Sequence, residues 1–223
     1  MLVTTDLVES IRSSLQALLS DRSRRNFRES IELIVTFKKT ELKPEEMKWR
    51  ETLYLPHPPA KEVKVCVAAE GETAIRAREA GAYLVLDRGA LEELSGNKKK
   101  ARKIAETCDW VLVQRELMPL VGRTLGPALG PRGKAPAPLP AGASIASTLD
   151  LFRRAVNLKM KEQPHVQVRI GTVDNSIEEL VANASAVLEK IGEKMGGKTI
   201  KKIYLKRTMG PVVEIGAGAG QRR

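Results

Sequence analysis

A glycine-rich segment, residues 126–134, ends in a Gly-Lys pair of the kind found in loops that hold nucleotide phosphates. Such a loop needs a glycine five residues before the glycine of that pair and a serine or threonine after the lysine. Ala128 and Ala135 occupy these two positions here. Pro127 and Pro131 also remove backbone N–H donors that would face a phosphate. The segment therefore argues against nucleotide binding, and a nucleotide-dependent enzyme is the least favoured alternative.

The residues that could bind a metal or act as a nucleophile are few and scattered. His57 and His165 have no partner at helical spacing, and Cys66 and Cys108 form no Cys-x-x-Cys pair. Two cysteines are too few for a disulfide scaffold, and each lies in an apolar run typical of a buried thiol. We therefore predict no catalytic centre, no metal site and no cofactor. The cysteine content indicates a reducing, cytoplasmic location, and no signal peptide is expected at the N-terminus.

The composition points to a polyanionic partner. The 223 residues include 38 Lys and Arg against 27 Asp and Glu, which gives a formal net charge of +11. Cations that neutralise phosphates release condensed counterions, so this excess favours nucleic acid. Aromatic residues make up only 4% of the chain, too few to stack on unpaired bases, and structured RNA or duplex fits better. The alternative is a protein that is simply basic. No apolar run is long enough to span a membrane.

The last predicted strand, residues 199–208, concentrates positive charge on one face. Alternation places Lys202, Tyr204, Lys206 and Thr208 together on that face. Polar residues of two other predicted strands can share it: Gln167 and Arg169, and Ser30, Thr36 and Lys38. Such a face can contact phosphates and 2′-hydroxyls without reading base edges, and the alternative is an ordinary solvated sheet face. The basic run at 98–103 is interpreted as a solvated helix start.

The first and last thirds of the chain share amphipathic strands and helices. In the strand that begins at Ser30, the apolar residues Ile31, Leu33 and Val35 alternate with polar ones, which predicts one buried face. Asp6 with Glu9 has the spacing of a helix capping box. The expected helices are residues 6–19, 147–160 and 176–195, the last also opened by a capping box, and the expected strands are 30–38, 51–55, 166–170 and 199–208.

The middle third has a different pattern. Short apolar runs at 63–69, 83–86 and 110–113 alternate with helical segments, which is typical of parallel βαβ units. A Gly- and Pro-rich stretch, residues 122–142, is expected to be a structureless and functional loop.

The predicted fold class is α/β. A discontinuous α+β sandwich domain, residues 1–60 plus 150–223, is interrupted by an inserted three-layer α/β/α, Rossmann-like domain, residues 61–149. Two crossings between the domains permit hinge motion. The predicted hinge is Pro56, His57, Pro58 and Pro59, a stiff, extended connector because three prolines can continue neither a helix nor a central strand.

Short segments along the chain resemble a known family. They are Asn26-Phe27, Leu55-Pro56-His57, Leu125-Gly126, Leu129-Gly130-Pro131-Arg132-Gly133-Lys134 and Thr208-Met209-Gly210-Pro211. They resemble the L-one family of large-subunit ribosomal proteins over nearly the whole chain, and archaeal members most closely. The family usually has glycine after the linker histidine, where this chain has Pro58.

The resemblance implies a monomeric structural protein that binds 23S-type rRNA and forms the mobile stalk near the E site. There it would assist release of deacylated E-site tRNA, and several family members repress translation of their own mRNA. The alternative left open is a free-standing translational regulator that binds mRNA through the same face. The RNA contacts implied by position are Phe27, Glu29, Ser30, Thr36, Gly171, Thr172, Thr208, Met209, Gly210 and Pro211, to which the basic sheet face adds Arg169, Lys202 and Lys206.

Overall fold

The structure, a computed structural model, describes residues 3–20, 26–41, 48–140, 142–161, 163–195 and 200–216. The chain divides into two compact units. Unit 1 comprises Met1–Lys61 and Arg154–Arg223, and unit 2 comprises Glu62–Arg153. Each unit has its own hydrophobic core, so each is described by itself.

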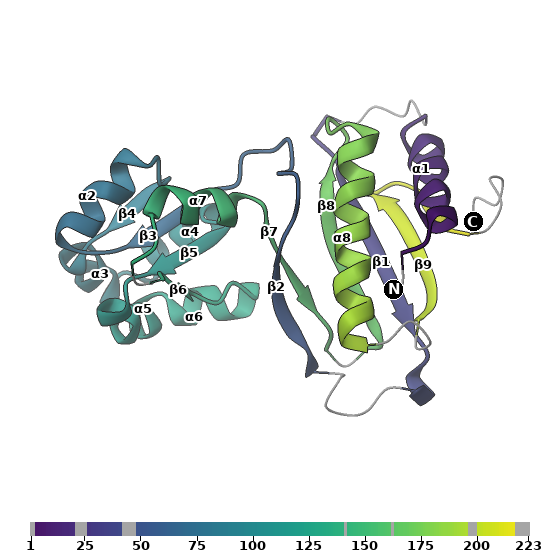
Figure 1. Ribbon diagram of the computed structural model, residues 1–223. Coiled ribbons are helices and arrows are strands. Elements are labelled where there is room, and N and C mark those ends of the chain that lie inside the picture. Colours follow the sequence, from purple (N-terminus) through teal and green to yellow (C-terminus); the bar gives the residue numbers. More distant parts are fainter. Residues whose placement is uncertain are drawn as a thin grey trace. The chain divides into compact units, whose positions relative to one another are not determined.

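Unit 1 is built on a four-stranded antiparallel sheet with strand order β10-β9-β1-β8. Helices α1 and α8 contact each other and cover one face of this sheet (Figure 1). Ile31, Leu33 and Val35 of β1 point into the core beneath the helices, as their alternation predicts. The elements are α1 (Thr5–Leu19), β1 (Ser30–Phe37), β8 (His165–Thr172), α8 (Ile177–Met195), β9 (Ile200–Arg207) and β10 (Val212–Glu214), with a short 3-10 helix, η1 (Lys39–Glu41).

The two helices of unit 1 begin at different kinds of cap. At α8 the predicted capping box is present, because Ser176 N–H donates to Glu179 Oε2 (3.0 Å) and Glu179 N–H donates to Ser176 Oγ (3.2 Å). At α1 the helix cap lies two residues before the predicted one, Asp6. Thr4 caps the helix by accepting from Leu7 N–H (3.4 Å), and Asp6 lies inside the first turn.

A two-stranded antiparallel ribbon, β2 (Arg50–Tyr54) with β7 (Ala155–Lys159), belongs to the same unit. The helix predicted over 147–160 was therefore wrong in its second half. Helix α7 (Ile145–Arg153) ends at Arg153, and the chain continues as β7. Val156, Leu158 and Met160 are buried, a period of two that pairing with β2 selects over the helical spacing.

Unit 2 contains a parallel sheet with strand order β4-β3-β5-β6. Its central strands are buried along their whole length, as parallel strands covered on both faces must be. Helix α7 packs with α2 and β3, while α3, α4, α5 and α6 contact one another in a second group (Figure 1). The elements are β3 (Val65–Ala68), α2 (Gly71–Glu79), β4 (Leu84–Leu86), α3 (Arg88–Ser95), α4 (Lys98–Thr107), β5 (Trp110–Val113), η3 (Arg115–Leu117), α5 (Met118–Thr124), α6 (Gly126–Leu129), η4 (Gly130–Arg132) and β6 (Ala137–Pro138). The predicted fold class is confirmed.

The Gly- and Pro-rich stretch 122–142 was wrongly predicted to be structureless. It contains the end of α5, the single turn of α6, a 3-10 turn and β6. Leu125 and Leu129 are fully buried in the core of unit 2. Pro127 is compatible with a helix here because it lies in the first turn, where its missing N–H has no partner to lose.

Cys66 and Cys108 are both fully buried, as predicted, but they form a disulfide rather than two thiols. Cys66 lies in β3, and Cys108 caps the C-terminus of α4. The fold brings their Cα atoms to 5.8 Å, within the usual range for a disulfide, although 42 positions separate them. A bond of this kind cannot be read from two isolated cysteines in a sequence.

Replacing both cysteines by alanine is expected to lower the free energy of unfolding of unit 2 by about 4 kcal/mol, because the disulfide restricts the unfolded chain. Urea unfolding followed by Trp110 fluorescence in a Trp49→Phe background reports on this unit. A reductant should move the wild-type curve toward that of the double variant and leave the variant's own curve unchanged. A wild-type curve that ignores reductant would contradict this contribution.

Candidate nucleic-acid interface

The sheet face of unit 1 that lies opposite α1 and α8 carries the predicted basic residues. The strand register places Glu32 of β1 between Arg169 of β8 and Lys206 of β9. Lys202 lies further along β9 and pairs with Glu214 of β10 at 2.9 Å. The face therefore alternates cations with carboxylates, and it is less uniformly positive than the strand pattern alone predicts.

Three strand ends meet at one edge of this sheet. Ser30 begins β1 opposite Thr172, the last residue of β8, and Ile31 lies opposite Arg207, the last residue of β9. Thr208 joins the strand ends at this junction through two hydrogen bonds to Ser30. Its N–H donates to the Ser30 carbonyl (3.0 Å), and its hydroxyl accepts from Ser30 N–H (3.1 Å). We call Phe27, Ser30 and Thr208–Pro211 the strand-end surface.

Two large apolar side chains are exposed on this surface. Phe27 is 49% exposed and Met209 is 76% exposed. Among the described residues, Met209 is the one non-glycine residue with a positive φ, 62°. It lies in a turn that Gly210 N–H closes by donating to the Arg207 carbonyl (2.9 Å). A left-handed backbone at a long side chain costs free energy, and such strain is typical of functional sites. The turn holds the Met209 side chain out toward solvent, where it can contact a ribose or a base.

Glu29, a predicted RNA contact, lies beneath the surface. Glu29 and Arg207 are 3% and 6% exposed and form a bidentate ion pair. Arg207 Nη2 donates to Glu29 Oε1 (2.6 Å) and Nε donates to Oε2 (3.1 Å). Arg207 Nη1 also reaches the Leu18 carbonyl near the end of α1 (3.4 Å). This arrangement gives Glu29 a structural part in holding the strand ends together.

Gly171 and Thr172 are buried directly under the strand end. A Cβ on Gly171 would lie 2.5 Å from Leu180 Cδ2 and 3.0 Å from Asn175 Oδ1, so any side chain there would force the buried Leu180 side chain to move. Thr172 donates to Asn175 Oδ1 from both its N–H (2.9 Å) and its hydroxyl (3.1 Å). These two residues shape the edge from below. Elsewhere on the predicted face, the Thr36 hydroxyl donates to the Lys202 carbonyl (3.0 Å) and so joins β1 to β9.

The linker residues Pro56–Pro59 pack against unit 1 through two asparagines that sequence reasoning missed. Asn183 of α8 binds both backbone groups of His57, and Asn175 Nδ2 donates to the Pro58 carbonyl (3.1 Å). The available signal was an asparagine at position 183 inside the apolar stripe of α8, where a polar residue needs a buried partner.

Glu179 completes this polar cluster. The Asn175 side-chain amide (3.0 Å), and then the Ser176 N–H, stabilise its carboxylate and lower the pKa of Glu179. A lowered folded-state pKa stabilises the fold above the unfolded value. That contribution is lost as the pH falls through the folded-state pKa.

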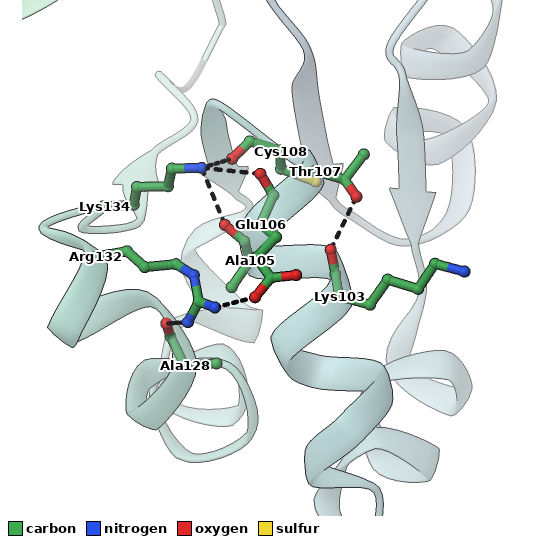
Figure 2. Close-up of polar contacts among 8 residues, drawn as sticks. All are labelled: Lys103, Ala105, Glu106, Thr107, Cys108, Ala128, Arg132 and Lys134. Atoms are coloured by element: carbon green, nitrogen blue, oxygen red, sulfur yellow. Dashed lines mark hydrogen bonds and ion pairs between the residues drawn. The ribbon is translucent and has the colours of Figure 1, made fainter.

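In unit 2, the Gly-Lys segment is used for structure. Lys134 Nζ donates to the carbonyls of Ala105 (3.0 Å), Glu106 (3.2 Å) and Cys108 (2.7 Å) at the end of α4 (Figure 2). Arg132 binds the Glu106 carboxylate and the Ala128 carbonyl (Figure 2). All three Nζ hydrogens of the lysine are engaged, which agrees with the sequence argument against a phosphate loop.

The carboxyl ends of β3 and β5 lie near a cavity of about 300 Å³, the place where open parallel sheets usually bind ligands. Glu72 and Glu116 line it together with Arg76 and Arg115, and Arg76 is paired with Glu72 at 2.5 Å. The Glu72 carboxylate paired with Arg76, together with Glu116 in the same lining, opposes phosphate binding. Within the described ranges, no group of three His, Cys, Asp or Glu could hold a metal, and no helix is long and apolar enough to cross a membrane.

Glu29→Gln is expected to lower the free energy of unfolding by about 3–5 kcal/mol, because it leaves the buried Arg207 charge without its counter-charge. Glu178→Gln breaks an exposed pair with Arg12 and serves as the matched control, with an expected loss below about 1 kcal/mol. Urea unfolding measures both. Equal losses for the two variants would show that burial of the Glu29 pair has no special importance.

Lys134→Met is expected to lower the free energy of unfolding of unit 2 by about 1–3 kcal/mol, because three carbonyls at the end of α4 lose their donor. Lys99→Met, an exposed lysine on the same helix, is the control and should change little. Thermal unfolding followed by Trp110 fluorescence, again in the Trp49→Phe background, measures both variants. An unchanged midpoint for Lys134→Met would rule out the capping role.

Comparison with known proteins gives the family. A model of the ribosomal protein L1p/L10e family matches residues 19–211. The large ribosomal subunit protein uL1 of Hyperthermus butylicus is 46% identical over 209 residues, covering 93% of this chain and 96% of the relative. The proteins of the same name from Aeropyrum pernix (46% over 211 residues; 95% and 97% covered) and Saccharolobus solfataricus (43% over 208 residues; 92% and 95%) are similar. The resemblance predicted from the short segments is confirmed, and this chain belongs to the ribosomal protein L1p/L10e family.

Proposed function

We propose that the strand-end surface of unit 1 binds a structured region of 23S-type rRNA. The chain is a structural protein of the large ribosomal subunit and not an enzyme, as its family membership shows. Association with rRNA follows from that place in the subunit. The finer proposal is that Phe27, Ser30 and residues 208–211 make the selective contacts.

The observation that carries this proposal is the junction of three strand ends. The Thr208–Ser30 hydrogen bonds and the buried Glu29–Arg207 pair hold that junction rigid. Phe27 and Met209 remain exposed on it, next to a sheet face that contains Lys206. A preorganised surface loses little conformational freedom on binding, so its contacts contribute more fully to affinity. Positive charge supplies the attraction to phosphates, and the shape of the strand ends supplies selectivity.

Unit 2 supports the second part of the proposal, that the protein forms the mobile stalk near the E site. It is an independent compact unit reached by two chain crossings, an arrangement that allows it to move on an anchored unit 1. In this proposal unit 1 stays on the rRNA, and unit 2 moves toward deacylated E-site tRNA and assists its release.

Repression of the protein's own mRNA would use the same strand-end surface. Because the rRNA and mRNA would compete for one site, excess rRNA fragment should displace the mRNA. Sedimentation with large subunits distinguishes a ribosomal protein from a free-standing regulator, which would stay in the supernatant.

Met209→Ala is expected to weaken binding of an rRNA fragment by about 1–2 kcal/mol, because it removes an exposed contact, while the melting temperature stays nearly unchanged. Thr208→Ala should weaken binding further and lower the melting temperature somewhat, because it also loses the Ser30 hydrogen bond. Ile75→Ala, an exposed apolar residue of unit 2, is the control. Filter binding at several salt concentrations measures affinity. Equal proportional losses of binding and stability in Met209→Ala would mean that the residue is merely structural.

A further inference from the structure

We infer that Asn175 is a positioning residue that holds the end of β8 and the linker in one fixed arrangement, so that the hinge lies beyond Ala60 rather than within Pro56–Pro59. The coupling to RNA rests on the proposed function of the strand-end surface. The placement of the hinge does not, because it follows from contacts within each unit.

Asn175 uses its whole side-chain amide in this cluster. Its Oδ1 accepts from the Thr172 N–H and hydroxyl and from the Ala60 N–H (3.0 Å). Its Nδ2 donates to the Pro58 carbonyl (3.1 Å) and to Glu179 Oε2 (3.0 Å). The residue is buried, so rotating the amide away from any of these partners would leave a polar group without water. The strand end and the linker therefore share one rigid connection.

A second asparagine fixes the start of the linker. Asn183 accepts from the His57 N–H (2.9 Å) and donates to the His57 carbonyl (3.0 Å) and the Ile170 carbonyl (2.7 Å). It is fully buried in α8. Ile170 immediately precedes Gly171, so this asparagine also joins the linker to the last residues of the strand β8.

Two arginines reinforce the same segment from unit 1. Arg154 Nη1 donates to the Pro56 carbonyl (3.3 Å), and Arg28 Nη1 donates to the Ala60 carbonyl (3.2 Å). Arg28 also pairs with Asp174 at 2.7 Å. The proline rings add fixed φ angles to this set of hydrogen bonds. The predicted hinge segment is thus the most constrained part of the linker.

The chain is freer immediately afterwards. Lys61 and Glu62 are exposed, and their N–H groups have no hydrogen-bond partner among the described residues. The next anchor belongs to unit 2, where Lys64 N–H donates to Asp109 Oδ2 (3.0 Å). Val63 is buried, so the bendable part of the first crossing is residues 61–62.

The second crossing is shorter. Arg154 belongs to unit 1, since its carbonyl accepts from Leu55 N–H (2.8 Å). Arg153 belongs to unit 2, since its guanidinium reaches the Gly81 carbonyl (3.1 Å) and Asp150 (2.6 Å). The rotation must take place about the ψ angle of Arg153 and the φ angle of Arg154, on either side of their planar peptide bond, and within residues 61–62.

Asn175 also couples RNA binding at the strand-end surface to the position of the linker. RNA bound to the strand-end surface would hold Ser30, which pairs with Thr172, and Thr172 would in turn hold Asn175 and the linker. By thermodynamic reciprocity, loosening the linker weakens RNA binding, at most by the factor by which bound RNA favours the fixed linker. Bound rRNA would then fix the linker, and the motion of unit 2 would take place only at the residues beyond it.

Hydrogen exchange on the wild-type protein without RNA tests where the hinge lies. The amides of His57 and Ala60 should be protected, and those of Lys61 and Glu62 should exchange rapidly. The reverse order, or equal protection across residues 57–62, would overturn the hinge placement. This measurement needs no variant and no RNA.

Asn175→Asp tests the coupling, because it keeps an acceptor for Thr172 and Ala60 but loses both donors and faces Glu179 with like charge. We expect faster exchange at Ala60 and at least about a fivefold loss of affinity for an rRNA fragment. Asn157→Asp is the matched control, since the new carboxylate still accepts from Thr52. Asn183→Asp is a second variant should Asn175→Asp unfold, because it keeps the acceptor for the His57 N–H but loses its donations to the His57 and Ile170 carbonyls.

The outcomes separate this inference from the proposed function. A loosened linker with unchanged RNA affinity would overturn the coupling, and so would weakened affinity with an unchanged linker. If Met209→Ala and Asn175→Asp both leave RNA binding unchanged while residues 61–62 still exchange fastest, the RNA-binding proposal fails and the hinge placement stands.

Discussion

The buried ion pair between Glu29 and Arg207 is the interaction on which unit 1 depends most. It joins the entry to β1 and the end of β9, two points at opposite ends of the chain, and Arg207 extends it to the last turn of α1. Burying both charges is costly unless each is fully paired. Any arrangement of these segments that separates Glu29 from Arg207 is therefore strongly disfavoured. The strand ends that this pair fixes are also the ones that carry the exposed Phe27 and Met209.

The same logic of paired buried polar groups extends from the strand ends to the linker. Asn175 and Asn183 connect β8, α8 and the backbone of residues 57–60, and each of their amide groups is engaged. In unit 2, Lys134 plays the equivalent part for the end of α4, next to the disulfide of Cys108. Each unit is thus made rigid internally, which is what a protein needs if it is to move one unit as a body relative to the other.

Much of the fold was accessible from local patterns. The alternation in β1, the capping box at Ser176 and the buried runs of β3 and β5 each have a short-range cause, and the structure confirms them. Errors arose where two periods fitted the same residues, as in β7, or where glycine and proline hid buried leucines, as in α6. In both places long-range packing decided between local alternatives.

The features of the candidate site also divide into those that follow from local sequence and those that depend on long-range packing. The amino-acid sequence by itself determined the positive charge, the alternating strand faces and the short segments that identify the family, because each of these depends on residue type and spacing alone. Only the tertiary structure decided that Glu29 is buried, that Cys66 and Cys108 bond, and that Asn175 joins the linker to the strand end. Those facts depend on which groups meet after the chain has folded, and no local pattern records a partner that lies 42 or more residues away.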